Sequence, residues 1–429
     1  MFFTAMVEFH VHWLHALATI FMSLLARRPQ QGAATLLFGV GTESLFQNDG
    51  DARFVAYCLK APVTPLQTAR RLIIQTALKA ISSVPERLSY VRLPLFELLQ
   101  GNPLGLADFV RLMANHIHAY LAYWQATLRH PIISILGRDF AYHAIAVHLN
   151  RKKLLDAVVI TNSNYSAQPL WMSDLPQRNF ETHLVWYAQN TIPIVSKHEP
   201  IRSDVPNYRH LRVDVSWVWS NGYADYLRSL NIRGTIHVVG PIVWQLLPDG
   251  EPDRDPEELV IAIYDVTPIS TAYAESIGLF GNYYSVENMV EFIDGIEHAR
   301  QLASQTLGRN VRVMLKHKRA HHADHDNRYV EKIARAEADG QLEIVPHTAN
   351  MYSMVAKSDL VIVIPYSSPV YVAEQLGISA IFFDPSDAVL PLYEKTQRIH
   401  FASGREELAA LTCDLLTQRI QTLTEKKSQ

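Results

Sequence analysis

The chain has 429 residues, of which 48% are hydrophobic and 19% charged, with a formal net charge of −3. This length exceeds one ordinary hydrophobic core and predicts two domains. The charge excludes a nucleic-acid-binding protein, because such proteins need a basic excess to neutralise phosphates. Cys58 and Cys413 are too few for a disulfide framework and fit a reducing compartment, so we expect a cytoplasmic protein.

From Val11 to Leu25 the sequence is largely apolar, and Arg27 and Arg28 follow it. A secretory signal has its basic residues before the apolar run, so this order argues against one. The run is also short for a membrane span and contains His15. We expect a buried or amphipathic helix, and shallow peripheral docking on the inner membrane stays open as the alternative.

The first half of the chain has the pattern of an α/β domain with a helical insertion, assigned to residues 1–247. Helices are expected over 64–128 and 223–230. Short β-branched runs predict the strands, at 35–40, 132–136, 157–161, 183–187, 213–219 and 235–239.

A linker is predicted at 248–256, where three prolines, a glycine and four acidic residues lie together. From 257 to 429 strands and helices alternate regularly. The strands are expected at 259–264, 311–315, 342–345, 360–364 and 380–383, and the helices at 286–303, 328–338, 351–356 and 370–376. This alternation predicts a parallel, doubly wound sheet, and hence two Rossmann-like α/β domains that face a cleft.

Ligands bind at the carboxyl ends of parallel strands, so the residues after each strand of the second domain are candidates. Asp265 follows the first strand, the turn Lys316-His317-Lys318-Arg319 the second, and Tyr366-Ser367-Ser368-Pro369 the fourth. Two serines at a helix start favour a bound phosphate, and the basic turn adds cations. We expect donor binding by Lys316, Lys318, Tyr366, Ser367 and Ser368. The alternative is that the serines only cap the helix.

Asp265 ends an apolar strand, where a carboxylate is costly unless it caps a turn or acts on a ligand. We expect it to be a catalytic nucleophile or general base, with an Asx-turn as the alternative. His317 is a further catalytic candidate or a hydrogen-bonded supporting residue. Glu181 and Glu199 are the remaining carboxylate candidates.

Amide side chains beside aromatic ones in the first domain suit the hydroxyl groups and faces of sugars. We expect acceptor binding by Asn162, Gln168, Trp171 and Asn190, with a place in the core as the alternative for Trp171.

The stretch from His321 to Asp326 contains residue types that bind metals. Its consecutive loop positions lack the spacing that points two ligands at one ion. We expect Asp324 or Asp326 to cap the next helix, and we expect no metal and no cofactor.

The order strand–acid, strand–basic/His turn, strand–Ser-Ser–helix resembles the C-terminal domain of bacterial GT-B glycosyltransferases that use CMP-activated sugars. These are the sialyltransferases and the Kdo transferases of surface-polysaccharide assembly, and the resemblance covers mainly residues 259–387. It implies that Lys316-His317-Lys318 and Ser367-Ser368 hold the CMP phosphate, and that Asp265 matches the nucleophile of retaining Kdo transferases. Lys318 stands where sialyltransferases usually have proline, which favours Kdo over sialic acid.

The resemblance therefore implies a metal-independent glycosyltransferase of lipopolysaccharide or other surface-glycan biosynthesis. It would move Kdo or a related acidic sugar from a CMP donor onto a glycan or lipid-linked glycan. A sugar-nucleotide epimerase or hydrolase, and a non-catalytic carbohydrate-binding protein, stay open as alternatives. A dinucleotide-dependent dehydrogenase is disfavoured because no GxGxxG follows a predicted strand.

Overall fold

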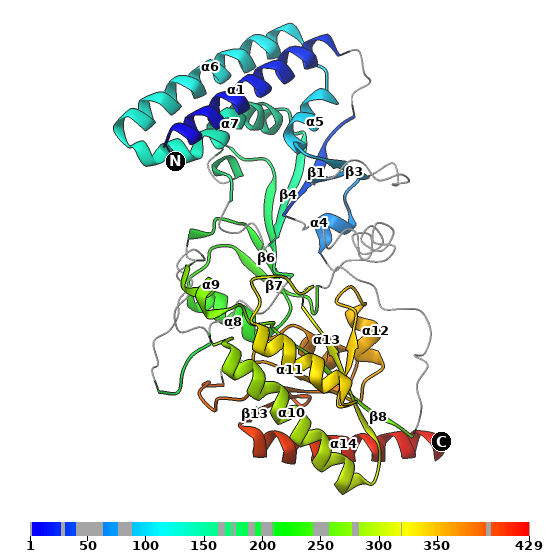
Figure 1. Ribbon diagram of the computed structural model, residues 1–429. Helices are drawn as coiled ribbons and strands as arrows, with labels where there is room; N and C mark the ends of the chain where they lie inside the picture. Colours follow the sequence, from blue (N-terminus) through cyan, green and yellow to red (C-terminus); the bar gives the residue numbers. More distant parts are fainter. Residues whose placement is uncertain are drawn as a thin grey trace. The chain divides into compact units, whose positions relative to one another are not determined.

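Figure 1 shows the computed structural model of the chain. It describes residues 2–26, 31–39, 63–75, 88–161, 168–172, 175, 177–187, 194–198, 208, 210–242, 257–276, 283–318, 320–391 and 396–428. The chain forms two compact units, each described here by itself. Unit 1 comprises Met1–Trp186, Pro206–Val218 and Leu230–Val239, and unit 2 comprises Tyr187–Val205, Trp219–Ser229 and Gly240–Gln429.

Unit 1 is built on a parallel sheet that has seven strands within the described residues, in the order β3-β2-β1-β4-β5-β6-β7. The strands are β1 (Ala34–Phe38), β2 (Leu72–Gln75), β3 (Leu88–Val91), β4 (Leu155–Thr161), β5 (Glu181–Val185), β6 (Val215–Val218) and β7 (Thr235–Val238). The central strands β1 and β4 are buried at nearly every position. Their continuous aliphatic sequences suit a sheet that is covered on both faces.

The helices of unit 1 are α1 (Phe2–Leu25), α4 (Thr64–Gln67), α5 (Pro94–Gln100), α6 (Leu106–Arg129) and α7 (Gly137–Arg151), with the short 3₁₀ helices η1 (Pro131–Leu136) and η3 (Leu170–Met172). Helices α1, α5, α6 and α7 pack together with η1, and in Figure 1 α1 and α6 lie side by side. Gly137 permits close packing here, because a Cβ at this position would lie 2.7 Å from the Cβ of Phe9. Within the described part of the chain, no helix combines the length and the apolarity that crossing a bilayer requires.

Unit 2 contains a second parallel sheet, with six strands in the described residues in the order β10-β9-β8-β11-β12-β13. The strands are β8 (Leu259–Tyr264), β9 (Val311–Lys316), β10 (Glu343–Val345), β11 (Leu360–Val363), β12 (Ser379–Asp384) and β13 (Ile399–Ser403). The helices are α8 (Asn221–Ser229), α9 (Thr271–Ser276), α10 (Val286–Leu307), α11 (Asn327–Ala338), α12 (Met351–Ala356), α13 (Pro369–Gln375) and α14 (Arg405–Ser428).

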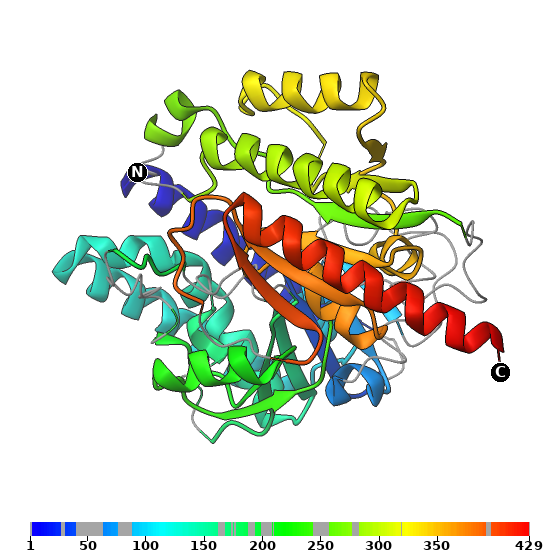
Figure 2. The same cartoon turned by 90° about the horizontal axis from the view of Figure 1, so that it is seen from below.

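Helices cover both faces of the unit 2 sheet. Alternate residues of β8, among them Ile261 and Ile263, belong to one hydrophobic core with Phe292 of α10 and Leu408 of α14. Figure 2 shows α14 running alongside α10. On the opposite face, the hydroxyl of Tyr264 donates to a backbone carbonyl of α12. Alternation of this kind is what a strand that is buried on both faces requires.

The two sheets share one strand order. In each, the first three strands are added side by side in one direction, and the fourth strand then pairs with the other side of the first strand. The reversal lies between β1 and β4 in unit 1, and between β8 and β11 in unit 2. In open parallel sheets, the loops at the carboxyl ends of the two strands beside this switch point leave a crevice in which ligands bind. Each unit therefore has one place where a site is expected.

The predicted fold class of two Rossmann-like α/β domains is confirmed by these two parallel sheets. Residues 132–136 were expected as a strand but lie in η1, where Ile132 and Ile135 are exposed rather than buried as a central strand would require. The helical region expected over 64–128 also contains β2 and β3. The sequence pattern did not indicate β13 or α14.

The expected linker at 248–256 lies outside the described residues. Two segments of the predicted first domain group with unit 2, namely Tyr187–Val205 and Trp219–Ser229. The predicted division at 247 and the observed division therefore differ in these two segments.

Candidate functional site

Asp265 is the first residue after β8, beside the switch point of unit 2. Its side chain has no exposed surface and accepts four hydrogen bonds from described residues. Oδ2 accepts from Nδ1 of His317 at 2.8 Å and from the hydroxyl groups of Tyr329 and Thr267 at 3.0 Å each. Oδ1 accepts from the backbone N–H of Lys318 at 3.1 Å. These donors compensate the loss of hydration that burial imposes on the carboxylate.

His317 is the first residue after β9, the strand next to β8, and its side chain is only 8% exposed. An ionised Asp265 can only accept hydrogen bonds, so we assign the proton of this pair to Nδ1 of His317. The other ring nitrogen, Nε2, is buried and has no hydrogen-bond partner among the described residues. A buried nitrogen without a partner requires an explanation, and a ring held ready for a ligand supplies one.

This network changes the interpretation of Asp265. A nucleophile or general base needs an oxygen lone pair that the substrate can reach. Both oxygens of Asp265 accept from protein donors, and the side chain is completely enclosed. The geometry favours a positioning role for Asp265 and leaves Nε2 of His317 as the group that can meet a substrate.

The basic turn continues from His317. Lys316 is the last residue of β9, and burial lowers the pKa of its ammonium group while the nearby charge of Asp265 opposes that shift. Lys318 is exposed, and its backbone N–H is held by Asp265. Arg319, the remaining residue of the turn, lies outside the described residues. The carboxylate therefore fixes both the imidazole and the backbone that carries the cations.

The turn from Tyr366 to Pro369 follows β11, across the switch point from Asp265. Tyr366 has a left-handed backbone with φ of 64°, a conformation that costs a residue with a side chain about 1–3 kcal/mol. Its buried ring, and a 3.2 Å hydrogen bond from its hydroxyl to the carbonyl of Leu390, hold it in place. The side chain of Ser368 makes no capping hydrogen bond to α13, so helix capping does not account for this serine.

The stretch from His321 to Asp326 contains the predicted helix cap. Asp326 precedes α11, and its carboxylate accepts a hydrogen bond from the N–H of Arg328, which confirms the capping prediction for this residue. The rings of His317 and His321 are 4.4 Å apart between centres. In the part of the chain that the structure describes, no three His, Cys, Asp or Glu side chains are grouped in a way that could hold a metal ion.

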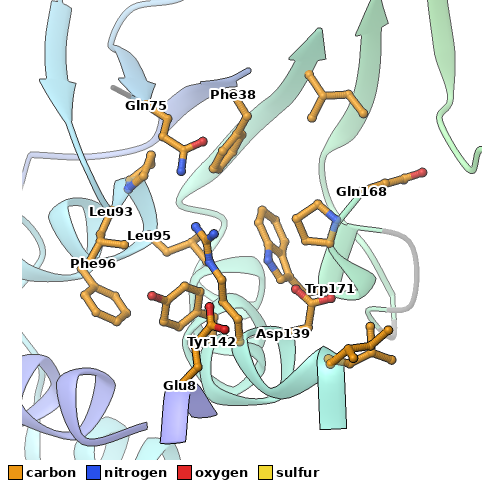
Figure 3. A pocket seen from close by; sticks show the side chains of 16 residues that line it. Glu8, Phe38, Gln75, Leu93, Leu95, Phe96, Asp139, Tyr142, Gln168 and Trp171 are labelled. Carbon is orange, nitrogen blue, oxygen red and sulfur yellow. The ribbon is translucent and has the colours of Figure 1, made fainter. Parts of the chain in front are cut away.

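A pocket of about 520 Å³ lies at the carboxyl end of the unit 1 sheet (Figure 3). Phe38 ends β1 and pairs in register with Ile160 of β4, so both strands of the unit 1 switch point reach the pocket. The rest of its wall comes from β2 and the helical layer: Glu8, Gln75, Leu93, Pro94, Leu95, Phe96, Ile135, Leu136, Arg138, Asp139, Tyr142, Gln168, Pro169 and Trp171. This size and apolar lining with a few polar groups are typical of a small-molecule site.

Glu8, Arg138 and Asp139 bring charge to this pocket. The guanidinium carbon of Arg138 lies 5.6 Å from the ring centre of Tyr142. Oδ2 of Asp139 accepts a hydrogen bond from the N–H of Leu170 at 3.3 Å. Burial raises the pKa of the Asp139 carboxyl, while the Leu170 hydrogen bond and Arg138 partly oppose the shift. A carboxyl with a raised pKa in a pocket is a candidate for proton transfer.

The predicted acceptor residues differ in their positions and contacts. Trp171 lines the pocket but is only 2% exposed, so it also belongs to the core. The side-chain amide of Gln168 is engaged with the backbone of Arg212, donating to its carbonyl at 2.8 Å and accepting from its N–H at 3.1 Å. Asn162 and Asn190 lie outside the described residues.

Of the two further carboxylate candidates, Glu181 begins β5, at the amino end of the strand and opposite the edge where the pocket lies. Glu199 is outside the described residues, as is Cys58. Arg138 and Asp139 line the unit 1 pocket and were not among the residues predicted from the sequence.

The family model for polysaccharide biosynthesis PFTS motif proteins matches residues 118–412, which is more than half of the chain. The chain belongs to this family. The matched residues include Asp139 of the unit 1 pocket and the Asp265, His317 and Tyr366 positions of unit 2. No curated protein matches the chain.

Several solved structures are similar to the chain. The wall teichoic acid polymerase TagF is 11% identical with a TM-score of 0.45, and the match covers 97% of this chain and 90% of TagF. The UDP-GlcNAc 2-epimerase from Methanocaldococcus jannaschii is 11% identical with a TM-score of 0.44, covering 89% of this chain and 91% of that one. TarM is 10% identical with a TM-score of 0.39, and the match covers 66% of this chain and about half, 52%, of TarM. At these values the similarity does not extend to function.

Proposed function

We propose that this protein is a GT-B glycosyltransferase that transfers a sugar from a nucleotide donor during polysaccharide assembly. Membership of a polysaccharide biosynthesis family supports the pathway class. The observation that carries the proposal is the buried Asp265–His317 pair at the unit 2 switch point, with Nε2 of His317 lacking a partner among the described residues. A phosphate at this crevice would meet that nitrogen and the cations of the same turn.

The donor phosphate is assigned to the ends of the two strands that flank β8. Nε2 of His317 and the ammonium of Lys316 approach it from β9, and the Ser367-Ser368 turn approaches it from β11. When the bond between the sugar and the phosphate breaks, the electron pair leaves with the phosphate, and positive groups around it stabilise the departing charge. A protonated His317 would also donate a hydrogen bond through Nε2 to that oxygen.

The name of the family supports this assignment of the serine turn. Pro365-Tyr366-Ser367-Ser368 has proline first, an aromatic residue second and two hydroxyl residues after it, which agrees with PFTS read as Pro-Phe-Thr-Ser. We infer that this segment is the chain's counterpart of the motif, with tyrosine for phenylalanine and serine for threonine. The left-handed backbone at Tyr366 gives the segment a shape that a generic strand-to-helix loop does not need.

Asp265 acts through His317 in this proposal. Its carboxylate accepts from Nδ1–H and fixes the ring direction, so that Nε2 points to the ligand without reorganisation at each turnover and donates to it when the ring carries both protons. The hydroxyl of Tyr329 remains a donor to Asp265, because burial and that carboxylate keep the pKa of the phenol well above its usual range. This arrangement replaces the nucleophilic role that the sequence suggested for Asp265.

The acceptor is assigned to the unit 1 pocket. Its aromatic walls suit a sugar face, and Arg138 suits an anionic or polar group of a glycan. Asp139 replaces Glu181 as the candidate that takes the proton from the attacking acceptor hydroxyl, because it lies in the pocket and burial raises its pKa. The donor nucleotide of our proposal is CMP, carrying Kdo or a related acidic sugar, and the acceptor is a lipid-linked surface glycan at the inner membrane.

The test is a nucleotide-release assay on the purified protein with a panel of CMP, CDP, UDP and GDP sugars, with and without a glycan acceptor. A transferase releases nucleotide faster when the acceptor is present and forms a longer glycan. Release that does not respond to acceptor identifies a hydrolase, and an altered sugar that stays on its nucleotide identifies an epimerase. Binding without any turnover would leave a carbohydrate-binding protein and end the proposal.

A further inference from the structure

The outer surface of the unit 1 helical layer carries many exposed apolar side chains. Along α1, the residues that recur every three or four positions form one stripe: Phe3, Val7, Val11, Leu14, Ala18, Phe21, Met22 and Leu25. The larger of these side chains are between 46% and 78% exposed. This spacing keeps the stripe on one side of a helix that is about 36 Å long.

Helix α6 carries a second stripe of the same kind. Its members are Leu106, Val110, Ala114, Ile117, Leu121 and Leu128, and the larger ones are between 50% and 78% exposed. The following helix η1 adds Ile132 and Ile135. The remaining exposed large hydrophobic side chains of the described residues are five, and they are scattered: Leu170, Val238, Tyr273, Leu302 and Leu390.

The two stripes lie on the same side of the layer. The helices run antiparallel, since Phe9 stacks on Tyr123 and, further along, the rings of Phe21 and Phe109 are in contact. On each helix, the spacing places the stripe next to the side that contacts the other helix. The third side of α1 contacts α7, where the hydroxyl of Tyr142 lies 2.7 Å from Nδ1 of His12. Both stripes therefore form one continuous surface directed away from α7, which we call the apolar face.

A basic edge borders the apolar face on α6. The exposed polar residues there are Arg111, His118, Gln125 and Arg129, and no exposed carboxylate accompanies them on the described helix. Asp108, the acidic residue of α6, is held by Arg151 and Lys152. A two-fold contact between two copies through α6 would give Arg111 and Arg129 no acidic partner on that helix. An anionic lipid surface offers both the apolar interior and the negative charge.

We propose that the apolar face docks on the surface of an anionic phospholipid bilayer. The stripes of α1 and α6 enter the boundary between headgroups and acyl chains, with both helices parallel to the membrane plane. Arg111 and Arg129 contact lipid phosphates at the edge of the face. From the sequence, membrane docking was an alternative for 11–25 alone, whereas the exposed stripe of α6 makes this helix an equal part of the proposed surface.

Membrane docking would also bring the acceptor pocket close to a lipid-anchored acceptor. Glu8 lines that pocket and is the residue after Val7 of the apolar face, so one turn of α1 belongs to both. An acceptor with a lipid anchor in the bilayer would reach the pocket from the surface on which α1 lies. This link rests on the proposed function, whereas the docking of the apolar face does not.

The experiment is sedimentation of the full-length protein with vesicles of phosphatidylcholine alone and with 30% phosphatidylglycerol. We expect binding to the anionic vesicles that weakens with salt. Val11→Glu together with Leu121→Glu should reduce the bound fraction at least tenfold. Arg111→Gln together with Arg129→Gln should weaken binding about fivefold per charge and reduce the salt dependence. Leu302→Glu, an exposed apolar position on α10, is the matched control and should bind like the wild type.

Light scattering in the absence of lipid tests whether a second copy of the chain, rather than a membrane, covers the apolar face. A wild-type dimer that becomes monomeric in the Val11→Glu, Leu121→Glu variant would assign the face to a second copy and overturn the proposal. Failure of the wild type to bind anionic vesicles, or equal binding by that variant, would also overturn it. Donor turnover with a water-soluble acceptor should be unchanged in the variant. If the wild type lacks this turnover but binds vesicles, the proposed function fails and the docking proposal stands.

Discussion

The two sheets share one strand order, but different side chains surround their switch points. In unit 2, the strand ends carry a buried carboxylate, an imidazole and lysines within a few residues of the sheet. In unit 1, the strand ends open into an aromatic-lined pocket of about 520 Å³ whose charges come from helices α1 and α7. Polar side chains that are held rigidly suit a phosphate, because its charge and shape are constant. A large pocket suits a glycan, because the arrangement of hydroxyl groups differs between glycans.

The proposed placement of the donor in unit 2 and the acceptor in unit 1 therefore depends on these side chains rather than on the fold. Substitutions in one unit should therefore change donor chemistry, and substitutions in the other should change acceptor use. Four predictions test this separation, beginning with the largest effect.

Replacing His317 should cause the largest loss. In His317→Asn, the amide nitrogen can still donate to Asp265 in place of Nδ1, while Nε2 is absent. We expect kcat for donor turnover to fall by about 10²–10³-fold with little change in thermal stability, because one preorganised donor to the leaving group is lost. The control is His298→Asn, a partly buried histidine of α10 whose Nε2 lies 3.6 Å from Glu406. A kcat within threefold of the wild type would remove His317 from the reaction.

Replacing Asp265 should affect both stability and rate. In Asp265→Asn the amide nitrogen must face one of the four donors, so we expect a loss of about 2–4 kcal/mol in unfolding free energy and about 10²-fold in turnover. The nitrogen chemical shifts of His317 should report the altered hydrogen bond at Nδ1. The control is Asp359→Asn, a buried carboxylate just before β11, which should lose stability but keep the turnover per folded molecule. An Asp265→Asn protein of normal stability with undiminished turnover would contradict the positioning role.

Replacing Asp139 should affect transfer and leave donor hydrolysis unchanged. We expect transfer by Asp139→Asn to fall about 10–100-fold, because the acceptor hydroxyl loses its proton acceptor. The raised pKa gives a sign to the pH dependence: wild-type transfer falls as the pH drops through this pKa and the carboxylate becomes neutral. That acid limb should begin at a higher pH than for an ordinary aspartate and be absent in the variant. Asp156→Asn, an exposed residue of β4, is the control; an unaltered acid limb in Asp139→Asn would assign the titration to another group.

Replacing the serine turn should weaken nucleotide binding and leave the rate of the chemical step nearly unchanged. In Ser367→Ala with Ser368→Ala, we expect nucleotide affinity to weaken by about 1–3 kcal/mol, which is about 5–150-fold, without unfolding. Calorimetry with CMP and other nucleotides measures the change. Ser379→Ala, at the amino end of β12, should bind normally. Equal affinities in all three proteins would show that the turn does not hold the phosphate.

The unit 2 site was partly readable from sequence because its residues follow short, strongly apolar strands. The ends of β8, β9 and β11 place Asp265, His317 and Ser367 at one edge, as the pattern predicts. The sequence could not show that Asp265 is enclosed, because its partner Tyr329 comes from a helix 64 residues further along the chain.

The residues of the unit 1 pocket could not be predicted from the sequence in the same way. Arg138 and Asp139 lie at the start of α7, just after residues whose β-branched composition suggested a strand. Local propensity was overridden there by packing on α1, where Phe9 contacts Gly137. The period of the α1 stripe was present in the sequence, but an amphipathic stripe alone does not tell whether its apolar side faces the core or the solvent.

The left-handed turn at Tyr366 limits which residues can replace this tyrosine. The backbone there is costly for any residue other than glycine, and the buried ring is the main compensation that the structure provides. The phenolic hydroxyl adds one hydrogen bond, at 3.2 Å, to the carbonyl of Leu390. Exchange between tyrosine and phenylalanine should therefore be nearly neutral in evolution, whereas leucine would lose the flat shape that fills the site. In the proposed correspondence between this turn and the family's PFTS motif, tyrosine would therefore keep the shape that phenylalanine provides.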